Sequence, residues 1–263
     1  MSIVHISASS REAVSHRDRS GERGVALIVA LMAMLFMMAL GTALILTTST
    51  ESRITRNFRI SSEALYAADA VLERAVDDML AIENWDMMLS GAAQSAFIDG
   101  PPSGARALAD GQRIDVGEIV NLANCRRMAA CSNADMDAVT ADRPWGSNNP
   151  RWQPFAWGYL DDITATSTVN SPFYVVMMVG DDPSENDGNP LRDGSVPCAQ
   201  GQASGCNPGS GVLALRAEAF GPFGAHKILE VTISRTDTAE REQNDTNGNG
   251  RAGVRILSWR EVR

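Results

Sequence analysis

The sequence predicts an α+β fold in which a long N-terminal helix packs on an antiparallel sheet. Residues 24–48 contain no charged side chain and are almost entirely apolar, which is typical of a helix that crosses a membrane. Residues 212–220 and 228–235 alternate apolar and polar side chains, and the segment 221–224 (GPFG) separates them. Two such runs around a turn predict a β-hairpin. A helix that covers one face of the sheet would bury the apolar surfaces of both.

The apolar stretch and the segment that follows it predict one continuous helix. A helix of about 20 residues crosses a bilayer core, and no charge occurs between Arg23 and Glu51. The chain has no proline before Pro101, so we expect this helix to run on to about Leu89. Beyond Glu51, apolar side chains recur at spacings of three and four, which predicts one buried face. They are Leu65, Ala68, Leu72, Ala75, Val76, Met79 and Leu80.

The pattern divides the chain into three segments. Residues 1–24 are polar and rich in Ser and Arg, which is typical of a leader peptide or a cytoplasmic tail. Residues 25–90 form the membrane-spanning and amphipathic helix, and residues 91–263 form an enlarged, loop-rich globular domain. Basic residues precede the apolar stretch and usually stay in the cytoplasm. We therefore expect a single-pass membrane protein whose C-terminal domain lies outside the cytoplasm.

The C-terminal domain has further signals of strands and loops. Residues 173–179 (FYVVMMV) are typical of a buried strand, and residues 253–259 are the expected last strand. Residues 142–158 combine three Trp with three Pro, which predicts an irregular loop folded over the core. Residues 91–113 are rich in Gly, Ala, Pro and Ser, which predicts a connection without regular structure.

Charge and motif content exclude several classes of function. The net charge is −9, and no basic stripe follows the membrane stretch, which argues against a nucleic-acid partner. His226 is the one histidine outside the leader, and we expect it to be a surface residue beside the hairpin turn. No nucleophile constellation, phosphate-binding loop or metalloprotease motif occurs. We therefore expect a protein that is not an enzyme and needs no cofactor, with calcium as the only candidate ligand.

The four cysteines form two local pairs, Cys125 with Cys131 and Cys198 with Cys206. All four follow the apolar stretch, so they are expected outside the cytoplasm, where disulfides persist. Zinc sites usually have about two to four residues between paired cysteines, and both pairs here are spaced more widely. Two short-loop disulfides are the favoured interpretation, and free thiols and a metal site are the alternatives.

One candidate calcium loop resembles half of an EF-hand. Asp245, Asn247 and Asn249 match its opening pattern, and Gly250 follows. The twelfth position, where a bidentate Glu is needed, is Ile256.

A second candidate calcium loop is rich in carboxylates. Asp181, Asp182 and Asp187 are its proposed ligands, and Glu185 and Asp193 lie nearby in the sequence. Such residues are also common in turns that bind no metal. Calcium binding at one of the two loops is therefore a hypothesis, and a turn that binds no metal is the simpler interpretation.

The N-terminal region resembles a known family. The stretches that carry the resemblance are residues 22–31 (ERGVALIVAL), 47–51 (TTSTE), 57–59 (NFR) and 62–70 (SEALYAADA). Together they resemble the N-terminal region of PilX-type minor pilins of type IV pili. The resemblance covers about residues 22–80, and the C-terminal part is similar only in outline, as a type IV pilin-like sheet that ends in a strand near Trp259.

The resemblance implies a processing site and a set of partners. The prepilin peptidase would cleave after Gly24 and leave Val25 as the mature, N-methylated terminus. The helix would then leave the membrane and pack in the core of the pilus filament. The implied partners are the major pilin, other minor pilins, the prepilin peptidase and the inner-membrane assembly platform.

Val29 is the one departure from the major pilins. They carry Glu at this fifth mature position, where it pairs with the terminal amine of the preceding subunit, because a carboxylate in an apolar layer is costly unless it is paired. A subunit with Val29 needs no subunit ahead of it, which predicts a position at the filament tip. The resemblance to PilX-type minor pilins implies a role in priming assembly, and adhesion is a further expected role. GspK-type pseudopilins resemble this chain in lacking that Glu and in their enlarged domain.

Three alternatives to a minor pilin stay open. A GspK-like pseudopilin of a type II secretion system would share the motifs. A single-pass anchored enzyme or sensor would retain its tail before Gly24. A secreted binding protein would be cleaved after about Ala43, where Gly41, Thr42 and Ala43 could serve as a signal-peptidase site.

Overall fold

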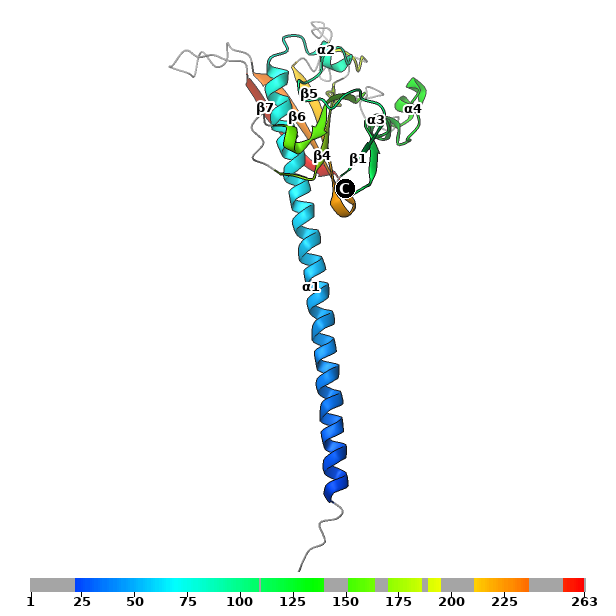
Figure 1. Cartoon of the computed structure of the whole chain (residues 1–263). Helices are drawn as coiled ribbons and strands as arrows, with labels where there is room; N and C mark the ends of the chain where they lie inside the picture. Colours follow the sequence, from blue (N-terminus) through cyan, green and yellow to red (C-terminus); the bar gives the residue numbers. More distant parts are fainter. Residues whose placement is uncertain are drawn as a thin grey trace, which may run out of the picture. The chain divides into compact units, whose positions relative to one another are not determined.

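The computed structural model separates the chain into two compact units, residues 1–56 and residues 57–263. The residues that it describes are 22–108, 110–139, 151–163, 170–185, 189–194, 211–236 and 253–262. Helix α1 (Glu22–Leu80) contributes its first part to one unit and its second part to the other. The continuous helix expected from the absence of proline is confirmed (Figure 1).

The second part of α1 buries a stripe of small and aliphatic side chains against the sheet. The buried residues are Ile60, Ala64, Ala67, Ala68, Val71, Leu72, Ala75 and Met79. Leu65 and Val76, which the periodicity placed on the buried face, lie at its margin and are partly buried. Ala64 and Ala67 belong to the stripe instead, and both side chains are almost completely buried.

The helix ends earlier than the sequence predicted. α1 stops at Leu80 rather than near Leu89, and a separate short helix, α2 (Asp86–Leu89), follows. The break has a packing reason, because the chain turns so that Trp85, Met88 and Leu89 are fully enclosed by the core.

The main sheet has five antiparallel strands in the order β3-β4-β5-β6-β7. Their bounds are β3 Gln153–Tyr159, β4 Tyr174–Asp181, β5 Val212–Gly221, β6 Ala225–Thr236 and β7 Gly253–Val262. The predicted hairpin is confirmed as β5 and β6, which pair from Val212 with Ser234 to Gly221 with Ala225 around the 3-10 turn η2 (Pro222–Gly224).

Both faces of the sheet are covered over part of its width. Phe173, Val175, Met177 and Val179 pack on the α1 side, whereas Tyr174, Val176 and Met178 pack on the other. Burial on both faces explains why β4 is apolar without interruption from Tyr174 to Val179. A small layer covers the second face (Figure 1). It comprises β1 (Ala105–Ala107), β2 (Arg113–Asp115) and α3 (Val116–Cys125), which partly replace the predicted connection.

The prediction of an irregular loop over residues 142–158 is wrong for its second half. Residues 153–159 form β3, and Trp152 and Trp157 are buried. Pro154 is tolerated because it lies at a register shift in the pairing with β4, where its missing N–H costs little. Residues 140–150 lie outside the described part of the chain.

Candidate functional site

The predicted processing site lies at the beginning of α1. A methyl group added at Gly24 would meet nothing within 4 Å, so packing inside the unit gives no reason for a glycine at this position. Val25 and Val29 lie one helical turn apart and leave about 60% of their surfaces exposed, at 62% and 60%. Both side chains therefore lie on the surface of the helix.

The first part of α1 has an exposed surface that is mostly apolar. Every residue from Gly24 to Arg56 is exposed, and from Gly24 to Leu46 nearly all of them are apolar. The helix is long and apolar enough to cross a membrane. An exposed apolar surface of this extent requires lipid or other protein around it.

The few polar side chains near the end of this stretch are satisfied within the helix. The Thr42 hydroxyl donates to the Met38 carbonyl at 2.8 Å, and the Thr48 hydroxyl donates to the Leu44 carbonyl at 2.9 Å. Thr47, Ser49 and Thr50 make equivalent bonds to carbonyls three or four residues earlier. Because each hydroxyl donates to its own helix, this stretch can lie in hydrocarbon or in a helical bundle without unpaired donors.

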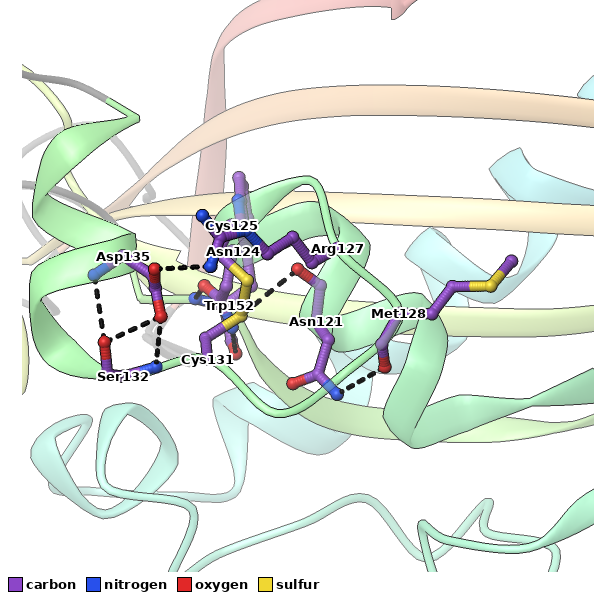
Figure 2. Close-up of a disulfide and its surroundings, with 9 residues drawn as sticks. All are labelled: Asn121, Asn124, Cys125, Arg127, Met128, Cys131, Ser132, Asp135 and Trp152. Carbon is purple, nitrogen blue, oxygen red and sulfur yellow. Dashed lines mark hydrogen bonds and ion pairs between the residues drawn. A yellow bond between two sulfur atoms is a disulfide. The ribbon is translucent and has the colours of Figure 1, made fainter.

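The structure contains the first of the two expected disulfides, between Cys125 and Cys131 (Figure 2). Cys125 ends α3, and Arg126 follows it in the left-handed conformation at φ 61°, which turns the chain toward Cys131. The loop is tied to β3 through Asn124, whose side chain donates to the Trp152 carbonyl and accepts from the Trp152 N–H. Cys198 and Cys206 lie outside the described residues.

After Cys131, the chain starts a short helix, α4 (Asn133–Ala138). Ser132 and Asp135 cap its first turn reciprocally, and Arg127 pairs with the Asp135 carboxylate at 2.7 Å (Figure 2). Hydrogen bonds from Ser132 lower the pKa of Asp135, against the opposing effect of burial. The disulfide, the cap of α4 and the ion pair of Arg127 therefore hold this part of the chain together, and the Asp135 carboxylate is paired.

The carboxylate loop proposed for calcium is partly described. Asp181 and Asp182 are both buried at the end of β4. The Asp182 carboxylate accepts from the N–H and the hydroxyl of Ser184, at 2.9 and 2.8 Å, as in a turn that binds no metal. Within the described ranges, no three His, Cys, Asp or Glu side chains form a group suited to a metal. Asp187, Asp245, Asn247 and Asn249 lie outside those ranges, so calcium stays a prediction.

A charged network that the sequence analysis did not anticipate links the last three strands. Arg216 on β5 contacts Glu218 at 2.8 Å and Glu230 on β6 at 2.7 Å, and Glu230 also binds Arg260 on β7. His226 contacts the other oxygen of Glu218 at 2.8 Å. Arg216, Glu218 and Glu230 alternate with the apolar core residues along the hairpin, so its register could have revealed the pairs.

Glu218 is suited to a structural role in this network. Burial alone would raise the pKa of Glu218, but the hydrogen bonds from His226 and Arg216, with the charge of Arg216, bring it below its usual value. A carboxylate held ionised between two donors is a poor proton donor. Its contacts join β5 to β6 and supply no catalytic acid.

Comparison with known proteins gives a family match in the N-terminal region. Residues 23–73 match a family model described as PilX N-terminal. No curated protein matches the chain. No solved structure matches it either. The matched residues include Gly24, Val25 and Val29 and extend through the first part of α1 into the stripe that packs on the sheet. Residues 23–73 are therefore similar to the N-terminal region of PilX-type pilins, as the sequence motifs predict.

Proposed function

We propose that the protein is a minor pilin of a type IV pilus, with a structural role and no catalytic activity. The observation that carries this proposal is the PilX N-terminal match over residues 23–73, on a helix whose first part exposes a continuous apolar surface. The match marks a type IV pilus-related pilin. The role of a minor subunit goes beyond the match and is supported by Val29.

The apolar surface of α1 suits both the membrane and the core of a filament. After cleavage at Gly24, the apolar part of α1 would hold the subunit in the inner membrane with the sheet domain in the periplasm. On assembly, the same surface would exchange lipid for the helices of the major pilin and of other minor pilins. The internally bonded hydroxyls near Thr48 permit both environments, since neither has to supply a hydrogen-bond partner.

Val29 supports a position at the tip of the filament. An isolated carboxylate at this depth would cost about 3 kcal/mol or more unless it is paired. Val29 avoids that cost but cannot pair with the terminal amine of a subunit ahead of it. The subunit would therefore start a filament and prime its assembly, and its folded domain would face outward and contribute to adhesion.

The experiment that tests the tip position is Val29→Glu. A chain with the fifth-position carboxylate could follow another subunit, so the variant should spread along the fibre, whereas the wild-type chain should label only its end. Immunogold electron microscopy of an epitope-tagged chain measures this distribution, with Val29→Leu as the matched control that should stay at the tip. A wild-type chain distributed along the whole fibre would contradict the proposal.

A GspK-like pseudopilin of a type II secretion system is the second candidate. It is favoured by the same Val29 together with the large domain after residue 91. Deletion of the gene separates the two functions, because loss of a pilus subunit should abolish surface pili and leave secretion of exoproteins intact. The opposite phenotype would assign the chain to secretion.

A further inference from the structure

The two edges of the main sheet differ in how they are completed. At the β3 edge, the segment 95–99 pairs with the strand through Ser95 N–H to the Phe155 carbonyl at 2.9 Å and Asp99 N–H to the Trp157 carbonyl at 2.8 Å. At the other edge, β7 pairs with β6 along its inner side, and no described segment pairs with its outer side. Among the described residues, the chain therefore covers one edge itself, and the ten residues of β7 have no neighbouring strand on their outer side.

The open edge carries large apolar side chains. Residues 255–260 are all exposed, and Ile256, Leu257 and Trp259 have exposed fractions of 62%, 51% and 49%. Ile256 and Trp259 lie opposite the buried residues Ile233 and Val231, so they belong to the face of the sheet that α1 covers farther in. A long apolar edge of this kind promotes association unless another strand covers it.

The other face of β7 is basic. Arg255 and Arg260 lie opposite Ser234 and Glu230, on the side of the charged network. Arg260 is paired with Glu230, whereas Arg255 makes no ion pair with any residue that the structure describes. A partner strand would therefore meet apolar groups on one face and an available guanidinium on the other.

This charge pattern disfavours the symmetric pairing of two copies of the chain that would join their apolar side chains. A two-fold antiparallel pair that places Ile256 opposite Trp259 also places Arg255 opposite Arg260 on the other face. The symmetry repeats this contact, so two pairs of guanidinium groups would face each other. Like charges directly opposite are destabilising, and carboxylates at the same positions would be stabilising.

We propose that the open edge of β7 binds an extended acidic segment of a partner protein, which joins the sheet as an additional strand. Main-chain hydrogen bonds to β7 supply most of the affinity in this mode of recognition. Apolar side chains of the segment pack on Ile256 and Trp259, and a carboxylate on its other face pairs with Arg255. The edge binds such a segment whether or not the chain is a tip subunit.

The test measures binding of defined peptides to the full chain in lipid nanodiscs. The probes are fluorescent ten-residue peptides that alternate Val with Glu, Val with Lys or Val with Ser, and fluorescence anisotropy reports their affinity. The Val–Glu peptide should bind most tightly. Arg255→Glu should weaken it roughly tenfold and should tighten the Val–Lys peptide by a similar factor. Because Arg255 is exposed, the variant should keep the circular dichroism of the wild type.

Two controls separate strand pairing from general electrostatic attraction. Arg192→Glu makes the same change in net charge at another exposed arginine and should leave all three affinities unchanged. A Val–Glu peptide with N-methyl groups on alternate residues cannot donate to the edge and should bind at least tenfold more weakly. Equal binding of the N-methylated peptide, an unchanged affinity for Arg255→Glu, or self-association of the chain through β7 would each overturn the proposal.

Discussion

Individual side chains in the folded unit balance burial against pairing, and Asp193 is the clearest case. Its backbone N–H donates to the Asp86 carboxylate at 2.8 Å, while its own carboxylate accepts from the Gly211 N–H at 2.7 Å. Burial, together with the negative charge of Asp86, raises the pKa of Asp193 to about 6, against the opposing effect of the bond from Gly211. The native state therefore binds this proton more tightly than the unfolded chain does.

The raised pKa of Asp193 predicts a stability profile. A carboxyl whose pKa is about 6 in the folded state contributes stability below its ordinary pKa of 3.8, and this contribution is lost as the pH rises toward 6. Asp193→Asn should remove that decline and raise the free energy of unfolding at pH 7 on the order of 1 kcal/mol, after allowance for solvent screening. Urea unfolding between pH 4 and about 7 measures it. Asp77→Asn on the exposed side of α1 is the control, and parallel profiles for both variants would refute the prediction.

Gly221 lies against the ring of Phe173 and leaves no room for a larger residue. Its backbone is extended, at φ −140°, which any residue can adopt, but an added methyl group would lie 2.1 Å from Phe173. Gly221→Ala should therefore destabilise the fold by about 1–3 kcal/mol through overpacking. In the double variant with Phe173→Ala, this extra cost should disappear, and chemical denaturation of the full cycle measures the coupling. Additive effects would show that the contact is unimportant.

At the scale of helices and strands, the sequence predicted the elements that a local residue pattern identifies. α1 was predicted because an uncharged run and an uninterrupted 3.6-residue period need no partner to be recognised. The hairpin of β5 and β6 was predicted because alternation and turn residues coincide. β3 was missed because Pro154 lies at a register shift that only the pairing with β4 reveals. The layer over the second face was missed because its contacts join residues far apart in the chain.

The loop between α3 and α4 should depend on its disulfide for stability. The disulfide of Cys125 and Cys131 closes a small loop, so replacing both residues by Ser should lower the free energy of unfolding by about 2 kcal/mol. Hydrogen exchange should show faster opening of α3 and α4 with the main sheet still protected. Met128→Ser, an exposed change within the same loop, is the control. Unchanged protection of α3 after removal of the disulfide would contradict this prediction.

At the scale of the whole molecule, one helix combines two different surfaces. Its first part presents an apolar surface that was predictable from composition. Its second part buries a stripe that was predictable in position but not in every member. The candidate processing residues were found from a local motif, and the family match covers the same residues. The charged network and the open edge of β7 could not be found from composition, because both depend on strand order.

The central claim is that the chain is a processed pilin, and the mass of its mature N-terminus tests that claim most directly. Protein purified from the native membrane would be digested, and its N-terminal peptide would be identified by mass spectrometry. We predict a peptide that begins at Val25 and carries one methyl group on its amine. A retained leader before Gly24, or a terminus near Leu44, would contradict the claim and would indicate an anchored or secreted protein instead.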